Sequence, residues 1–188
     1  MQGSDREEIV RLTAEHSGQW GLMHTRRLLY LISQIGDGLA YDQEIVWAAA
    51  HLHDWGAYAP WAQTGVDHAV RSTKVAHEYL AEKGFPEDVI RRVVECIATH
   101  HSGDRGRSIE AILLSDADAL DFLGVVGVLR DFSKNPRDMR KAHRSIMERM
   151  QKVPGLICLD RAREIAARRL QVMRELLQEF EAETNGCY

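Results

Sequence analysis

The sequence predicts an all-α protein, a single domain of about eight helices, and three observations support this prediction. Apolar residues recur at intervals of three and four, as on helix faces. No segment of four or more residues alternates as a strand would. The 188 residues, 45% hydrophobic and 28% charged, can bury one core without disulfides.

Capping residues, prolines and glycines set the expected helix ends. Ser4 with Glu7 has the pattern of a capping box, and Asp42, Ser108 and Asp160 are N-cap candidates. The predicted helices cover residues 5–15, 24–35, 42–53, 67–83, 86–99, 108–123, 136–150 and 160–180. Prolines open the fifth and seventh of these helices, and two glycines allow close packing or a kink near the end of the sixth. They are Pro86, Pro136, Gly124 and Gly127.

Charge and hydropathy exclude several classes of partner. The net charge of −4, from 24 basic and 28 acidic residues, gives no electrostatic footprint for a nucleic acid polymer or an anionic membrane. No apolar run reaches the roughly 18 residues of a membrane span. The N-terminal sequence MQGSDREEIV lacks the pattern of a signal peptide. We therefore expect a cytoplasmic protein, and its three cysteines, without CxxC spacing, are expected to be reduced.

Histidines are the most informative part of the composition. Seven of the nine lie between residues 24 and 101, and imidazole is the commonest metal ligand. His53 and Asp54 end an apolar helix, where two adjacent side chains can turn toward one point and bind a divalent cation. The same pair also fits an ordinary capped helix end. Asp118 lies in an otherwise apolar helix, where a charge is costly unless it is paired or bound to a metal.

The ordered motifs resemble those of the HD superfamily of metal-dependent phosphohydrolases. They are MHTRR around His24, AHLHDWG around His53 and Asp54, THHSG around residues 100–101, and DADALDFLG around Asp118. The resemblance covers about residues 20–132. It implies an HD-type helical bundle, with the C-terminal helices of residues 136–183 packing on it within one domain, residues 1–188. It also implies that His24, His53, Asp54 and Asp118 are the metal ligands.

The acidic run of the last motif contains three aspartates with different expected roles. Asp116 and Asp118 lie about 200° apart on a helix, so only one of them can face the metal. The family pattern Ala-Asp-x-Leu matches at residues 117–120, which favours Asp118. Asp121, one turn later, is either an acceptor for a ligand histidine or a surface acid.

Three further histidines match positions at which some HD proteins hold additional ions. They are His68, His100 and His101, and the alternative is that they line the pocket and bind phosphate. His77 and His51 point away from these positions, so His77 is expected at the surface and His51 in packing. The resemblance implies one divalent metal ion per chain (Mn, Fe, Mg, Zn, Ni or Co) and leaves a second ion open.

Three arginines are candidates for binding substrate phosphate. Arg27 follows His24 by three residues and Arg71 follows His68 by three, so each pair shares a helix face. Arg130 is similar to a basic position that follows the Asp motif in small bacterial HD hydrolases. Each arginine is otherwise a solvated surface charge.

The segment after the His-Asp pair differs from several HD nucleotidases, which carry a general acid there. Here it contains aromatic residues, Trp55, Tyr58 and Trp61, and no acid. This puts a 5′-nucleotidase in doubt. The aromatic residues predict either a wall on which a base stacks or a hydrophobic plug over the core.

The resemblance implies that the protein hydrolyses a small phosphorylated substrate, namely a nucleotide or another phosphoester or pyrophosphate, with a metal-activated water. Asp54 is expected to be catalytic, as a ligand that also orients the water. Two alternatives are a di-iron HD-type oxygenase and a non-catalytic metal- or ligand-binding HD module. The sequence is compatible with both a monomer and a homodimer.

Overall fold

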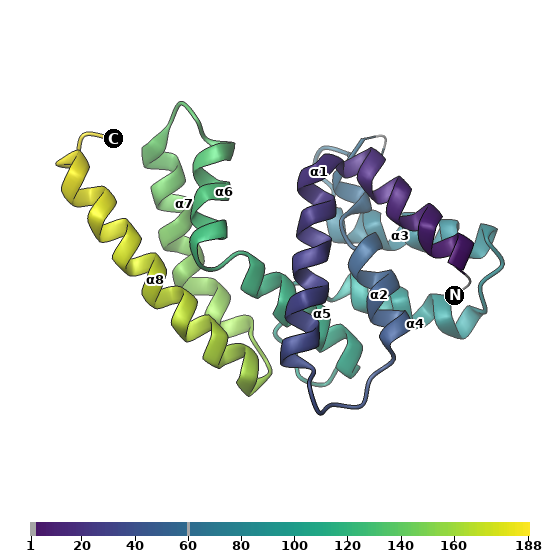
Figure 1. The fold of residues 1–188 in the computed structure, drawn as a ribbon. Coiled ribbons are helices and arrows are strands. Elements are labelled where there is room, and N and C mark those ends of the chain that lie inside the picture. Colours follow the sequence, from purple (N-terminus) through teal and green to yellow (C-terminus); the bar gives the residue numbers. More distant parts are fainter. Residues whose placement is uncertain (1–2, 60) are drawn as a thin grey trace.

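The computed structural model describes residues 3–59 and 61–188, which form an all-α fold with eight α-helices, two 3₁₀ helices and no strand in these ranges (Figure 1). The helices are α1 (Gly3–Ile35), α2 (Gln43–Leu52), η1 (Trp55–Ala57), α3 (His68–Glu82), α4 (Glu87–Ala98), α5 (Ile109–Asp121), α6 (Val125–Lys134), α7 (Met139–Lys152), η2 (Val153–Leu156) and α8 (Asp160–Thr184). The prediction of an all-α bundle is confirmed.

Helices α1 to α5 pack around one apolar core. Each contributes fully buried side chains, among them Leu28 of α1, Leu52 of α2, Leu80 of α3, Ile97 of α4 and Leu113 of α5. Helices α6 to α8 lie side by side on the other side of α5 and form what we call the C-terminal lobe (Figure 1). Helix α5 therefore lies between the two halves of the molecule.

Asp116 attaches the C-terminal lobe to α5. Its buried carboxylate accepts hydrogen bonds from the backbone amides of Cys158 (2.9 Å) and Leu159 (2.7 Å), just before α8 begins. Farther along α8, Arg169 donates to the carbonyl oxygen of Leu120. A buried carboxylate with two amide donors is well satisfied, which explains a charge at this apolar position.

The first two predicted helices form the two parts of α1, and only a kink separates them. Helix α1 runs through residues 16–23 with a kink at Gly18, whose φ of 64° lies in the left-handed region. Ser4 is already helical, so the predicted capping box does not mark the helix start. By contrast, Asp42 and Ser108 cap α2 and α5 as predicted, by accepting hydrogen bonds from backbone amides of the first turn.

Other boundaries also differ from the prediction. Gly124, with φ of 82°, does not kink the sixth predicted helix but ends it, and α6 begins at the next residue. Helix α7 begins at Met139, capped by Asp138, rather than at Pro136. Asp160 is the first residue of α8 and not its cap. Among the described residues, no helix is both long and apolar enough to cross a bilayer.

Candidate metal centre

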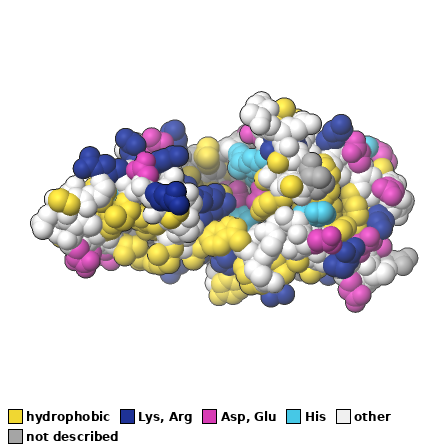
Figure 2. Space-filling model, turned by 90° about the horizontal axis from the view of Figure 1, so that it is seen from above, with side chains coloured by type: hydrophobic (Ala, Val, Ile, Leu, Met, Phe, Trp, Pro, Cys, Tyr) yellow, Lys and Arg dark blue, Asp and Glu magenta, His cyan; other side chains and the backbone are white. Residues whose placement is uncertain are grey.

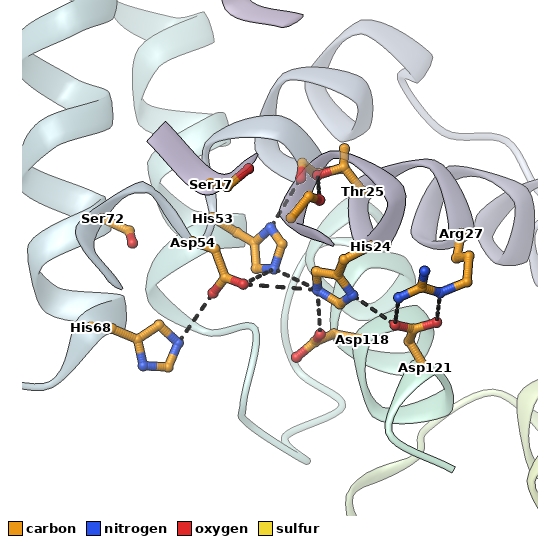
Figure 3. Close-up of polar contacts among 12 residues, drawn as sticks. Ser17, His24, Thr25, Arg27, His53, Asp54, His68, Ser72, Asp118 and Asp121 are labelled. Carbon is orange, nitrogen blue, oxygen red and sulfur yellow. Dashed lines mark hydrogen bonds and ion pairs between the residues drawn. The ribbon is translucent and has the colours of Figure 1, made fainter. Parts of the chain in front are cut away.

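Three buried side chains from three helices meet at one point, which we call the first cluster. They are His24 from the middle of α1, His53 from the end of α2 and Asp118 from α5 (Figure 3). The Nε2 atom of His24 lies 3.3 Å from Nε2 of His53 and 3.2 Å from Oδ1 of Asp118. These side chains were predicted to converge, and the structure brings them together.

A second group of imidazoles lies beside the first. His68 begins α3, and His100 and His101 follow α4; one ligand atom from each lies within 4.8 Å of the others. We call these three histidines the second cluster. The structure therefore contains two groups of side chains, each of which could hold a metal ion.

Asp54 lies between the two clusters. Its Oδ2 atom is 3.5 Å from Nε2 of His53 and 3.9 Å from Nε2 of His24, whereas its Oδ1 atom is 3.5 Å from Nε2 of His68 (Figure 3). The backbone turns sharply here (φ −103°, ψ 0°), which releases Asp54 from α2 and opens η1. One carboxylate can therefore face both clusters.

Hydrogen bonds at Nδ1 of two histidines, one from each cluster, leave their Nε2 atoms unprotonated and able to bind a cation. Nδ1 of His53 lies 3.0 Å from the carbonyl oxygen of Ala50, and Nδ1 of His100 lies 2.6 Å from that of Ile97. Because a carbonyl oxygen only accepts, each Nδ1 must carry the proton and each neutral ring presents a lone pair at Nε2.

The residues present fit a divalent cation. Nε2 of His100 and Oδ1 of Asp118 are buried and have no hydrogen-bond partner, which is costly unless an ion satisfies them. Two ligands about 2.1 Å from one ion lie about 3.0–3.4 Å apart at octahedral or tetrahedral angles. The separations of 3.2 and 3.3 Å in the first cluster have this size.

Carboxylates make the site attractive to cations. Burial lowers the pKa of His24, but the nearby carboxylate of Asp118 and the hydrogen bond to Asp121 outweigh burial and raise that pKa to about 9. Burial raises the pKa of Asp118, yet His24 and the other imidazoles hold it well below its usual range. The site therefore keeps ionised carboxylates around its imidazoles, and a cation can replace the proton on His24.

Asp121 supports His24, as one of the two predicted alternatives required. Its Oδ2 atom accepts a hydrogen bond from Nδ1 of His24 at 2.7 Å. Arg27 was predicted to bind substrate, but its guanidinium instead pairs with both oxygens of Asp121, at 2.6 and 2.8 Å (Figure 3). The prediction did not anticipate that α5 brings a buried acid to this face of α1.

Arg71 is also occupied within the protein. Its guanidinium donates to the carbonyl oxygens of Gly56 (2.6 Å) and Gln63 (2.7 Å) and to that of Val66, so it holds the loop between α2 and α3. These contacts give Arg71 a structural role, and its binding of substrate phosphate stays a prediction. The carbonyl oxygens that capture the guanidinium belong to η1 and to described residues after it.

Arg130 is the remaining predicted phosphate ligand. Its guanidinium lies over the ring of Phe122 (4.2 Å) and near that of Trp20 (5.7 Å). Its Nε and Nη1 atoms are buried without a hydrogen-bond partner, and it forms no ion pair within residues 3–59 and 61–188. Figure 2 shows basic side chains of the C-terminal lobe beside the hollow in which histidines and acids are visible.

The aromatic segment after Asp54 forms mainly a plug. Trp55 is buried, donates through Nε1 to Thr13 (3.0 Å) and stacks on Trp61. A base therefore cannot stack on Trp55.

The other histidine predictions are confirmed: His51 is buried and donates to the carbonyl oxygen of Trp47 (2.8 Å), and His77 is exposed.

Sequence patterns missed one part of the site. A cavity of about 210 Å³ adjoins both clusters, and its outer wall comes from Arg149, Val153 and Leu156 of α7 and η2. These residues belong to no motif, and their spacing is that of ordinary helix packing. Only the position of the C-terminal lobe reveals them.

Comparison with known proteins places the clusters in a family context. The profile of the HD domain matches residues 21–123. The uncharacterized protein YpgQ of Bacillus subtilis is 28% identical over 190 residues, which cover 93% of this chain and 89% of YpgQ. Ribonuclease Y of Oceanobacillus iheyensis is 34% identical over 104 residues, 55% of this chain but only 18% of that enzyme.

Solved structures with the same fold extend over nearly the whole chain. B. subtilis YpgQ in complex with ADP has a TM-score of 0.74 at 22% identity, covering 96% of this chain and 95% of that one. A predicted HD superfamily hydrolase from an uncultured Thermotogales bacterium has a TM-score of 0.67 at 27% identity, covering 96% and 92%. The fold is that of the HD superfamily hydrolases.

Proposed function

Because the chain belongs to the HD domain family, we propose that it is a metal-dependent phosphohydrolase acting on a nucleotide or another small phosphoester or pyrophosphate. One observation carries the proposal: Asp54 lies between two clusters, and His53 and His100 present to them Nε2 atoms that can bind a cation. A structural metal site is closed by its protein ligands, whereas this site adjoins a cavity.

A divalent cation bound at such a centre supplies Lewis-acid activation of water and of a phosphoryl oxygen. His24, His53, Asp54 and Asp118 would hold the first cation, and the second cluster with Asp54 would hold another. Asp54 has the further role of accepting a hydrogen bond from the attacking water, which orients the lone pair of that water toward phosphorus.

Arg130 has the properties of a phosphate ligand. Its positive charge has no carboxylate partner within the described ranges, and two of its nitrogen atoms are unsatisfied. A phosphoryl oxygen would satisfy this charge and offset the negative charge that develops during hydrolysis. The relative YpgQ forms a complex with ADP, which supports a nucleotide as the first substrate class to examine.

The test is a phosphate-release screen with defined metals. The purified chain is stripped with a chelator, reloaded with Mn²⁺, Fe²⁺, Mg²⁺, Zn²⁺, Ni²⁺ or Co²⁺, and assayed for phosphate and pyrophosphate release from nucleotides and small phosphoesters. We expect turnover with at least one metal and its loss in Asp54→Ala, while the exposed-acid control Asp88→Ala stays active.

Absence of release with every metal, or undiminished release by Asp54→Ala, would refute the hydrolase. Oxygen consumption by a coloured, iron-loaded protein would instead support the oxygenase alternative, so both are measured on the same preparations.

A further inference from the structure

The cavity beside the clusters has a mixed lining. One end is formed by His100, His101 and Asp118, and the rest is mainly apolar, with Phe122 of the α5–α6 connection and Val153 and Leu156 of η2. A group held in the cavity would therefore touch the metal ligands at one end and hydrocarbon at the other.

The polar groups of the outer walls are already satisfied. Arg149 pairs with both oxygens of the buried Asp131, with Nη2 at 3.0 Å from Oδ1. The hydroxyl of Ser115 donates to the carbonyl oxygen of Ser102 at 3.0 Å. Away from the clusters, the cavity thus offers no unpaired charge to an anion, and its apolar walls favour a neutral organic group.

The size of the cavity restricts what it can hold. Its volume of about 210 Å³ is below the roughly 300–1,000 Å³ typical of pockets that enclose a whole drug-sized ligand. One ring system fits this description better than an entire nucleotide. The phosphates of a nucleotide would remain outside, between the clusters and Arg130.

We propose that this cavity binds the base of a nucleotide whose phosphate lies at the clusters, and that Leu156 and Val153 make the protein prefer nucleotides to inorganic polyphosphate. This inference rests on the proposed function. Both residues lie outside the matched range 21–123. The C-terminal lobe therefore adds substrate preference to a catalytic centre that the HD domain supplies.

The test compares two substrates that share a triphosphate chain, a nucleoside triphosphate and inorganic tripolyphosphate. Leu156→Trp places a larger side chain at a partly exposed position (37% exposed) that should tolerate it. We expect the ratio of kcat/KM for the nucleotide to that for tripolyphosphate to fall about tenfold or more, since misfit by even one carbon atom has effects of this order.

Val126→Trp is the matched control, on an exposed face of α6 outside the cavity (39% exposed), and should leave the ratio unchanged. Circular dichroism and metal content verify that both variants fold and load. A Leu156→Trp variant that loses activity equally on both substrates, or on neither, would overturn the base subsite.

A binding measurement separates failure of the subsite from failure of the proposed function. If the unaltered chain cleaves no phosphate compound, the hydrolase is refuted, and calorimetry with ADP and the metal-loaded chain still decides on the subsite. We expect Leu156→Trp to weaken ADP binding about tenfold or more and Val126→Trp to retain it. Equal binding by both variants, or no ADP binding by the unaltered chain, would overturn the proposal.

Discussion

His24 and Asp121 are 97 residues apart in the sequence and are joined by a hydrogen bond of 2.7 Å between Nδ1 and Oδ2. The bond fixes the ring of His24 with Nε2 toward Asp118. Arg27 holds Asp121 in turn, so three residues from α1 and α5 form a chain that ends at the first cluster. This chain gives Arg27 a positioning role.

The first prediction concerns metal affinity. Removal of an acceptor behind a metal-binding histidine typically costs about 10- to 100-fold in affinity. Asp121→Ala should show this loss, and Arg27→Ala a smaller one, when measured by competition with a chelator of known affinity. The exposed-acid control Asp88→Ala should bind metal as the unaltered chain does. Unchanged affinity in Asp121→Ala would mean that other contacts hold His24.

The second prediction distinguishes the two buried acids of α5. Asp116→Ala leaves the buried amides of Cys158 and Leu159 without an acceptor, which should lower the free energy of unfolding by about 2–4 kcal/mol with or without metal. Asp118→Ala should instead abolish the stabilisation that metal adds. Urea unfolding with and without Mn²⁺ measures both, and a metal-dependent effect of Asp116→Ala would contradict the assignment.

The third prediction concerns the number of ions. Two clusters that share Asp54 should hold two ions per fully loaded chain, and His68→Ala should hold one. Metal analysis after removal of unbound ions gives the stoichiometry. His77→Ala, an exposed histidine on the same helix, is the control and should keep two. One ion in the unaltered chain would exclude a second site and leave the one-metal hydrolase intact.

The fourth prediction is a pH dependence at the start of α2. Burial raises the pKa of Asp42, but the backbone amides of Ile45 and Glu44 and the guanidinium of Arg92 outweigh burial and hold this pKa below its usual value. The stabilisation is therefore present above the unfolded-state pKa of about 3.9 and is lost as the pH falls through the lower folded-state value.

Asp42→Ala should accordingly lower the free energy of unfolding by about 1 kcal/mol at pH 7. This cost should shrink as the pH falls below about 4, where first the unfolded and then the folded state is protonated. Urea titrations at several pH values measure this difference. A cost that is constant from pH 7 to pH 3 would show that the charge of Asp42 contributes nothing.

The sequence predicted the first cluster well because each of its residues lies in a short motif that can be recognised without knowledge of the rest of the fold. The order of short motifs named His24, His53 and Asp54, and the helical phase with the family pattern selected Asp118 over Asp116. Spacing also placed Arg27 on the face of His24, which is correct. It could not reveal that Asp121 would arrive from another helix and pair with Arg27.

Contacts between segments far apart in the sequence also explain the other differences between the prediction and the structure. The carbonyl groups that capture Arg71 come from η1 and the residues after it, and Gly124 was expected to allow close packing or a kink because a glycine in a helical pattern does not by itself specify which. The cavity wall at Arg149 and Leu156 depends on how the C-terminal lobe packs on α5. Such contacts have no signature in spacing, since they join segments far apart in the chain.

The attachment of the C-terminal lobe through Asp116 also bears on how such proteins can diversify. Asp116 binds backbone amides rather than side chains, so its two hydrogen bonds do not depend on the side chains at positions 158 and 159 and exclude only proline, which has no amide hydrogen. Descendants of one ancestor could therefore differ in the sequence of the C-terminal lobe, including η2, while they retain the hydrogen bonds that attach it to Asp116. Chimeric chains that combine this HD part with the lobe of a relative should inherit the substrate preference of the lobe donor.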